Sequence, residues 1–292
     1  MSLKVAVTGS SGFIGSYFTT KNPEFLITEI DLLKNKIESV SFEGIDVVLH
    51  LAAIAHQKDN NENLYYTINR DLAYKTALRA KEHGVKQFLF MSTVKVYGES
   101  SETDNPFDES SDCNPKDAYG KSKFEAEKLI QALENDNFRV AIIRSPLVYG
   151  PEVRANMLSL IKLVNRIPML PFANVNNKRS LVYIGNMNHF IRLVILQRAS
   201  GIFLPADNET LSIKELCSEI AKAIEKKVFF FSIPNWFVKI IRCYRPSIYN
   251  KLFSSFEIDN HKTRNILSYI SPYSSKEGIH NMIDWYKKPK YR

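Results

Sequence analysis

The chain has 292 residues, of which 45% are hydrophobic and 24% are charged. This balance is typical of a globular protein with one large domain, or a large domain and a smaller lobe, and it excludes a disordered or fibrous chain. The formal net charge is +8, with the basic residues scattered among acidic ones, so we expect no nucleic-acid partner.

Targeting and metal-binding signals are not apparent in the sequence. The three cysteines are widely spaced and form no metal-binding pattern, so we predict no metal site. The N-terminus leads straight into a strand without a signal-peptide pattern, and no apolar run approaches the ~18 residues of a membrane span. We therefore expect a cytoplasmic protein.

Over the first half of the chain, short apolar runs alternate with helical stretches. The predicted strands cover residues 4–7, 25–30, 47–50, 87–91 and 140–144, and helices are predicted over 69–83 and 118–134. This alternation is typical of a parallel sheet covered by helices. The predicted fold class is α/β, with a Rossmann-like, doubly wound parallel sheet.

The pattern changes after about residue 150. Helical segments at 156–164, 186–197 and 212–226 are separated by short extended pieces. We predict a first domain over 1–150. Residues 151–292 are expected to form mainly a smaller, discontinuous C-terminal lobe, with some segments returning to the sheet. A cleft between the two would hold the substrate.

Three glycines directly follow the first strand, at the start of a helix, in the spacing G-x-x-G-x-x-G. Glycines let the backbone turn tightly and approach a pyrophosphate, while the helix N-terminus offers N–H groups and a partial positive charge. Domain 1–150 is therefore predicted to bind a dinucleotide. The residues expected to contact it here are Gly9, Ser11, Gly12, Phe13, Ile14 and Gly15.

Asp31 lies 22 positions after Gly9, a spacing that suits an acid on the ribose hydroxyls and favours NAD, with NADP left open. Only 15 residues separate Gly15 from Asp31, so this half of the sheet is predicted to be one strand–helix unit short. Three readings of Asp31 stay open: contact with the ribose, a place beside the adenine, or a cap on a loop.

Tyr119 and Lys123 are four positions apart and share one face of a predicted helix. We expect the lysine ammonium to lower the pKa of the phenol, making Tyr119 a general acid and base. Thr93, at the end of a strand, offers a hydroxyl that would bond and polarise a substrate oxygen. The alternatives are a solvent-facing Tyr/Lys pair and a simple Ser/Thr turn.

Five motifs occur in one order along the chain: T-G-S-S-G-F-I-G at 8–15, D-V-V-L-H-L-A-A at 46–53, S-T-V-K-V-Y-G at 92–98, Y-G-K-S-K at 119–123 and R-S-P-L-V-Y-G-P at 144–151. With them, nearly the whole chain resembles the extended short-chain dehydrogenase/reductase family, in its sugar-nucleotide epimerase/dehydratase branch.

The resemblance implies roles for particular residues. Thr93, Tyr119 and Lys123 are implied to be catalytic, and Asn156 and Arg179 are implied to bind the substrate together with Thr93 and Tyr119. Arg179 resembles the arginine that grips the nucleotide diphosphate; a surface ion pair is its alternative, and a helix N-cap is the alternative for Asn156. The further cofactor contacts implied are Leu51, Ala52, Ala53, Ser92, Tyr119, Lys123, Pro146, Leu147 and Val148.

The resemblance also implies an activity. We expect NAD-dependent epimerisation at C4 of a UDP-hexose or UDP-N-acetylhexosamine through a transient 4-keto sugar. An NAD(P)H-dependent 4-keto-sugar-nucleotide reductase of polysaccharide biosynthesis is the close alternative. A non-catalytic dinucleotide sensor is disfavoured because the tyrosine and lysine are both present. A 4,6-dehydratase is disfavoured because Val94-Lys95 replaces the Asp-Glu pair typical of that branch. A homodimer, formed through the helices at 69–83 and 118–134, is also implied.

Residues 233–256 mix aromatic with basic side chains, and Pro234 and Pro246 bound a helix of about a dozen residues. Two readings stay open: a helix of the lobe that covers the substrate cleft, which we favour, or an amphipathic helix on a membrane surface.

Overall fold

The computed structural model describes residues 2–55, 61–101 and 105–288, apart from the side chain of residue 235. Its centre is a parallel sheet in the order β2-β1-β3-β4-β5-β9, every neighbouring pair running in the same direction. The strands are β1 (Lys4–Thr8), β2 (Leu26–Ile30), β3 (Val47–His50), β4 (Gln87–Thr93), β5 (Arg139–Ser145) and β9 (Gly201–Phe203). The five strands predicted in the first 150 residues are confirmed, with ends that agree or differ by at most two residues.

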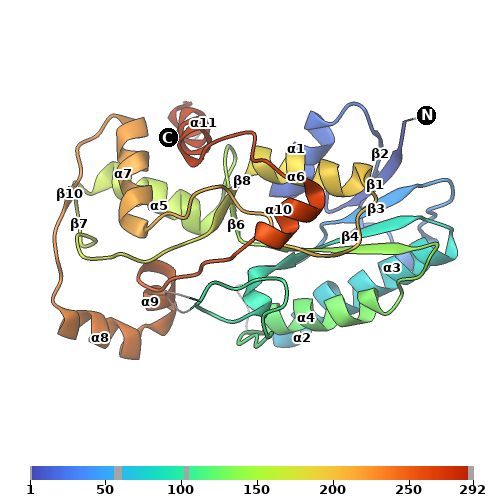
Figure 1. The fold of residues 1–292 in the computed structure, drawn as a ribbon, viewed down its shortest axis with the longest axis horizontal. Coiled ribbons are helices and arrows are strands. Elements are labelled where there is room, and N and C mark those ends of the chain that lie inside the picture. Colours follow the sequence, from blue (N-terminus) through green and yellow to red (C-terminus); the bar gives the residue numbers. More distant parts are fainter. Residues whose placement is uncertain (1, 56–60, 102–104, 289–292) are drawn as a thin grey trace.

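Helices cover both faces of this sheet (Figure 1). Alternate residues of each strand point to opposite faces. Val5 and Val7 pack in one core with α1 (Phe13–Lys21) and α6 (Ile184–Leu196). Ala6 packs in another core with α3 (Ala73–Glu82) and α4 (Ala118–Gln131). Strands β1, β3, β4 and β5 are thus buried on both sides, which confirms the doubly wound α/β fold.

The sheet ends early on one side. β2 is an edge strand, and only a single turn of 3-10 helix, Ile37–Ser39, lies between it and β3. After β2 the chain therefore crosses β1 and joins the opposite side of it as β3. This confirms that the first half is shortened by one strand–helix unit.

The helix predicted over residues 69–83 begins earlier and is not uniform. It comprises α2 (Glu62–Tyr65), a π-helical stretch (Tyr66–Leu72) and α3. Asn69 lies in the π-helical stretch, where its amide bonds both backbone groups of Ile54 and donates to Ser122. Periodicity alone did not predict the π-helical stretch, because its apolar spacing stays close to that of an α-helix.

The lobe lies at the other end of the molecule (Figure 1) and has a core of its own. Two small parallel pairs, β6 (Leu147–Tyr149) with β8 (Leu181–Tyr183) and β7 (Met169–Leu170) with β10 (Phe229–Phe230), lie in this part of the chain. The helices that contribute to its core are α5 (Ala155–Arg166), α7 (Ile213–Ile224), α9 (Pro246–Leu252) and α11 (Ser275–Lys287), while α8 (Asn235–Tyr244) contacts α9. The helices predicted at 156–164, 186–197 and 212–226 are confirmed as α5, α6 and α7.

Parts of the second half belong to the sheet. β9 pairs with β5, and α6 packs on α1, while Leu267 of α10 (His261–Leu267) is buried in the same core as α6. The division of the chain at residue 150 stays a prediction. None of the helices described is long and apolar enough to cross a membrane.

A buried ion pair joins α4 to the end of β5. Glu127 and Arg144 are 2% and 5% exposed and lie 2.8 Å apart at their closest atoms. Arg144 also donates to the Tyr97 hydroxyl, and Ser92 donates to Glu127. The side chains that would lose partners if either charge were removed are themselves buried, so removing one charge alone strands the other in a low-dielectric interior.

We therefore predict that Glu127→Ala lowers the free energy of unfolding by about 3–5 kcal/mol, since it leaves the Arg144 guanidinium unpaired. The double variant Glu127→Leu/Arg144→Met should recover most of that loss, because it removes both charges and keeps the volume. Urea denaturation near neutral pH measures both. A double variant as unstable as Glu127→Ala would contradict this account of the pair.

Candidate active site

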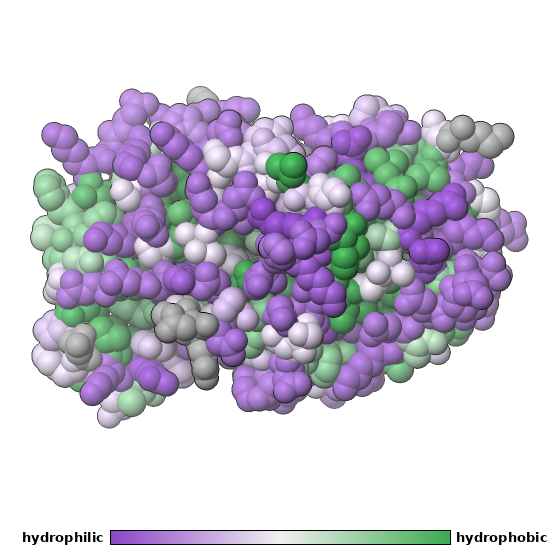
Figure 2. Space-filling model, in the orientation of Figure 1, coloured by the Kyte–Doolittle hydropathy of each residue, from purple (hydrophilic) through white to green (hydrophobic). Residues whose placement is uncertain are grey.

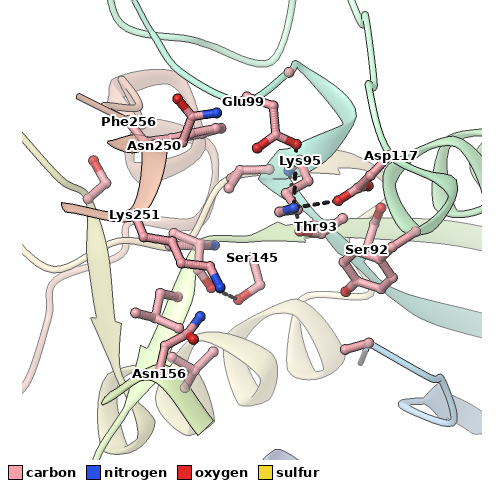
Figure 3. Close-up of a pocket in the computed structure, with 18 of the residues that line it drawn as sticks. Ser92, Thr93, Lys95, Glu99, Asp117, Ser145, Asn156, Asn250, Lys251 and Phe256 are labelled. Atoms are coloured by element: carbon pink, nitrogen blue, oxygen red, sulfur yellow. Dashed lines mark hydrogen bonds and ion pairs between the residues drawn. The ribbon is translucent and has the colours of Figure 1, made fainter. Parts of the chain in front are cut away.

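A cavity of about 820 Å³ opens at the carboxyl ends of β4 and β5, where open α/β sheets bind ligands. In Figure 3, side chains from the end of β4, the start of α4, the start of α5 and from α9 face one another around it. The structure brings together much of the predicted site here, namely Ile14, Ser92, Thr93, Tyr119, Pro146, Leu147, Val148, Asn156 and Arg179.

Two glycines of the loop, Gly9 and Gly15, have no room for a side chain. Gly9 has φ +70°, and a Cβ there would lie 2.7 Å from the backbone nitrogen of Ala52. A Cβ on Gly15 would lie 2.3 Å from the Gly9 carbonyl oxygen. The loop is thus pressed between α1 and the segment that follows β3. Gly12 is the N-cap of α1 and has no side chain to satisfy the first N–H groups of the helix.

These features fit a dinucleotide pyrophosphate, because an uncapped helix N-terminus offers N–H groups and a partial positive charge to an anion. Ser11, Gly12 and Ala53 are exposed, whereas Phe13, Leu51 and Ala52 are partly buried beside the loop. The cofactor contacts assigned to these residues stay predictions.

Asp31 directly follows β2, at the same edge of the sheet. Its carboxylate accepts a hydrogen bond from the Leu33 backbone N–H at 2.9 Å and lies 3.5 Å from the Lys34 ammonium. The backbone hydrogen bond, with help from Lys34, holds the pKa of Asp31 below its usual value. Asp31 therefore caps a turn and also presents a charged carboxylate at the carboxyl edge, so the loop-cap and ribose readings are compatible.

Tyr119 differs from its prediction in one respect. Burial raises the pKa of the Tyr119 phenol to about 12; a hydrogen bond with Thr93 lowers it, and the nearby Asp117 carboxylate raises it further. The expectation that Lys123 lowers this pKa is therefore wrong for the protein alone. The phenol is held in its protonated form, beside the Thr93 hydroxyl.

Lys123 lies beneath this pair and is 2% exposed. Its ammonium donates to the Met91 carbonyl at 2.8 Å and stands 4.5 Å from the centre of the Phe90 ring. Burial lowers the pKa of Lys123 to about 7, although the Glu127 carboxylate acts in the opposite direction. Lys123 is therefore poised between its charged and neutral forms near neutral pH.

Ser92 is one of the implied cofactor contacts, and that role stays a prediction. It lines the cavity, but its Oγ donates to Glu127 inside the protein. Ser92 therefore contributes backbone and Cβ to the cavity wall, while its hydroxyl holds the buried ion pair.

Sequence reasoning missed a charged cluster on the cavity wall. Lys95 donates to Asp117 at 2.5 Å and lies 3.5 Å from Glu99 (Figure 3). Asp117 is also the N-cap of α4, accepting from the Gly120 N–H at 2.7 Å. The pattern of an aspartate just before the helix carrying Tyr119 is a helix-start signal that could have located Asp117; Glu99 has no comparable signal.

On the opposite wall, Arg179 is half-buried, and burial lowers its pKa. Its Nη1 donates to the backbone carbonyls of Asn250, Lys251 and Ser254, at 3.0–3.3 Å. The surface ion-pair reading is therefore wrong: within the described part of the chain, no carboxylate forms a salt bridge with Arg179.

Asn156 lies in the first turn of α5 and faces the cavity from there (Figure 3). The helix begins at Ala155 with Arg154 as its N-cap, so the N-cap reading of Asn156 is wrong. Three α9 residues, Ser247, Asn250 and Lys251, complete this wall, and no motif predicted them.

The parallel sheet, the glycine loop and the Thr/Tyr/Lys group at the carboxyl edge define a short-chain dehydrogenase/reductase type of protein. Residues 5–203 match the NAD dependent epimerase/dehydratase family. The chain belongs to this family.

Curated relatives agree with this assignment. The chain is 33% identical to a UDP-glucose 4-epimerase of Vibrio cholerae, over 96% of this chain and 94% of the relative. It is 28% identical to the N-acetyl-α-D-glucosaminyl-diphospho-ditrans,octacis-undecaprenol 4-epimerase of Escherichia coli O157:H7, over 80% and 76%. In fold it is similar to the UDP-glucuronic acid 4-epimerase of Bacillus cereus solved with NAD, with TM-score 0.78, 21% identity and coverage of 99% and 100%.

The low pKa of Lys123 predicts how stability changes with pH. The unfolded chain has a lysine pKa near 10.5 and the folded protein one of about 7, so the folded protein binds fewer protons in this window. Its free energy of unfolding should therefore rise with pH. Relative to Lys123→Met, the wild type should gain about 2–3 kcal/mol between about pH 7 and 9. Urea denaturation across this range measures it; parallel curves for the two proteins would contradict the low pKa.

Proposed function

We propose that this protein epimerises C4 of a UDP-hexose or UDP-N-acetylhexosamine, with NAD as cofactor, through a transient 4-keto sugar. The observation that carries the proposal is the Thr93 and Tyr119 hydroxyl pair on one wall of the cavity, facing Asn156 and Arg179 on another. One end offers proton transfer and the other a cation for a diphosphate, which is what a glycosyl diphosphate with a reacting carbinol requires.

NAD would be held by the loop at residues 9–15, with Asp31 at the ribose. The packed Gly9 and Gly15 and the uncapped start of α1 support this placement. The ionised Asp31 favours NAD over NADP, because a carboxylate repels a 2′-phosphate. When bound, NAD supplies the acceptor and donor of the C4 hydrogen and, in its oxidised form, a positive charge.

The chain's own residues supply the proton chemistry. Tyr119 takes the proton of the C4 hydroxyl and later returns it, while Thr93 hydrogen-bonds the same oxygen and keeps it in place. A pKa of about 12 suits the phenol as a proton donor to the keto oxygen. Accepting a proton requires a lower pKa, and any positive charge placed beside the phenol favours the phenolate. The positive charge of bound NAD would act in this way, whereas Lys123 does not lower the Tyr119 pKa in the protein alone.

Epimerisation requires the 4-keto sugar to present both faces to the same groups, while its diphosphate stays bound. A cavity of about 820 Å³ gives a hexose room to turn. Arg179 supports the diphosphate end, because its half-buried guanidinium lines the cavity without a carboxylate partner among the described residues. Asn156 would bond the substrate from the start of α5.

The 4-ketoreductase would use the same three residues, but two relatives that match 96% and 80% of the chain are epimerases. They support the epimerase. They also differ in the carrier of the sugar, a nucleoside diphosphate in one name and a polyprenyl diphosphate in the other. Arg179 would recognise the diphosphate in either case.

The assembly and location of the protein also belong to this proposal. We infer a homodimer formed through α3 and α4, the helices implied by the family resemblance, and a cytoplasmic location. Light scattering of the purified protein tests the dimer.

The activity is tested by incubating the purified protein with UDP-N-acetylglucosamine and with UDP-glucose, without added NAD(P)H. We expect the C4 epimer of one of them and no net change in nicotinamide absorbance, because the redox change is internal. Turnover of only a 4-keto sugar, with NAD(P)H consumed, would identify a reductase instead. Bound dinucleotide without any turnover would identify a sensor.

Tyr119→Phe should lower turnover by at least about 10²-fold, since proton transfer by a positioned side chain contributes about 10²–10⁴-fold. Dinucleotide affinity should stay nearly unchanged, because the ring and its packing remain. Tyr65→Phe is the matched control: its ring lies 6.3 Å from Tyr119, and it also lines the cavity. Equal losses in the two variants would remove Tyr119 from the proton transfer.

A further inference from the structure

The segment of residues 226–256 leaves an apolar face uncovered. Helix α8 exposes one side, with Trp236 63% and Tyr244 78% exposed. Positions 236, 240 and 244 follow one another along this side at helical spacing. Phe237 and Ile240, also exposed, lie on the same side, and α9 adds Ile248. Before α8, Phe229 and Phe231 are exposed at β10, where Figure 2 shows hydrophobic side chains at the end of the lobe.

The same segment holds most of the net positive charge of the protein. Residues 226–256 contain six basic side chains and no acidic one, whereas the rest of the chain has 33 basic and 31 acidic side chains. The expectation that basic residues are interleaved with acids throughout is therefore wrong here. All six are exposed; they are Lys226, Lys227, Lys239, Arg242, Arg245 and Lys251.

The two sides of helix α8 differ in polarity. Lys239 and Arg242 lie on the side opposite the apolar face, and the Arg242 guanidinium stands 5.4 Å from the centre of the Tyr249 ring of α9. The half-buried side chains of α8, Val238 and Ile241, lie between these two sides, and the aromatic side stays exposed. An ordinary lobe helix buries most of its apolar side against its core.

This segment continues into the wall of the active-site cavity. Ser247, Asn250 and Lys251 of α9 line the cavity, and Arg179 holds the end of α9 through its backbone carbonyls. The α8 face is therefore connected to this wall of the cavity through α9, which α8 contacts.

We propose that the α8 face is a docking surface for an anionic lipid bilayer. Its exposed aromatic and aliphatic side chains would enter the headgroup region, where Trp and Tyr are favoured, and the basic side chains around them would attract anionic headgroups. A second copy of the chain is the poorer occupant, because a surface of six cations without one acid repels its own copy.

Docking would place the α9 wall of the cavity beside the bilayer. A sugar diphosphate carried on a polyprenyl chain could then reach the site without its lipid leaving the membrane. This consequence rests on the proposed epimerisation, whereas the docking itself does not.

The docking is tested by co-sedimentation of the whole protein with phosphatidylcholine vesicles, with or without about 30 mol% phosphatidylglycerol. We expect the wild type to sediment with the anionic vesicles and to be released by high salt. The variant Trp236→Glu/Tyr244→Glu should bind the anionic vesicles at least about tenfold more weakly. The variant Lys239→Glu/Arg245→Glu should lose about fivefold or more in affinity for each basic side chain that is replaced. Ile270→Glu is the matched control, since its side chain is 76% exposed on another surface and should bind like the wild type.

Epimerisation of the soluble sugar nucleotide, measured in parallel, shows whether each variant is folded, because none of these residues lies in the cavity wall. Equal binding of the wild type to neutral and anionic vesicles, or none to either, would overturn the proposal. So would light scattering in which Trp236→Glu/Tyr244→Glu changes only the oligomeric state, since a second copy would then cover the face. A wild-type protein that binds anionic vesicles but epimerises no sugar nucleotide would contradict the proposed function and leave the docking proposal standing.

Discussion

The buried carboxylate of Glu127 is the charge on which the arrangement of the site depends. It neutralises Arg144 at the end of β5, accepts the Ser92 hydroxyl at the end of β4, and favours the charged form of Lys123 one turn away on α4. These contacts hold the carboxyl ends of β4 and β5 against α4, the helix that carries Tyr119. Without such a charge, two cations would share a dry interior at the carboxyl edge of the sheet.

Above this network, the three residues proposed to be catalytic lie at different depths from the cavity. Thr93 and Tyr119 line the cavity, with a hydrogen bond between their hydroxyls. Lys123 lies beneath them and donates a hydrogen bond to the Met91 carbonyl. The protein alone therefore stores the proton on the phenol, and the balance shifts only when positive charge arrives nearby. A site that holds the proton by default is suited to reversible transfer, because it needs no external acid to complete the return step.

Most of the scaffold could be predicted from the sequence, because strands buried on both faces read as apolar runs and the glycine loop has a fixed spacing. The one-unit shortening after β2 also followed, from the short distance between Gly15 and Asp31. The rise in the Tyr119 pKa could not be predicted. It depends mainly on the burial of the phenol in the folded protein and, to a smaller degree, on the carboxylate of Asp117 at the start of α4. The π-helical stretch around Asn69 and the α9 wall could not be predicted either, because both depend on distant contacts rather than on local pattern.

Residues 233–256 show why both readings of that segment were reasonable. One of its helices, α9, does line the cavity, while the other, α8, keeps its aromatic side exposed. Composition alone cannot separate these roles, because it does not show which neighbours the helices on either side of Pro246 contact.

The central claim is that one carbinol carbon loses and regains the same hydrogen inside a closed site. The most direct test is to epimerise a sugar nucleotide carrying deuterium at C4 in ordinary water and to follow the label by NMR. The account predicts that deuterium stays at C4 in both epimers, since the hydrogen never meets solvent. Replacement of the C4 deuterium by solvent hydrogen during epimerisation would contradict it.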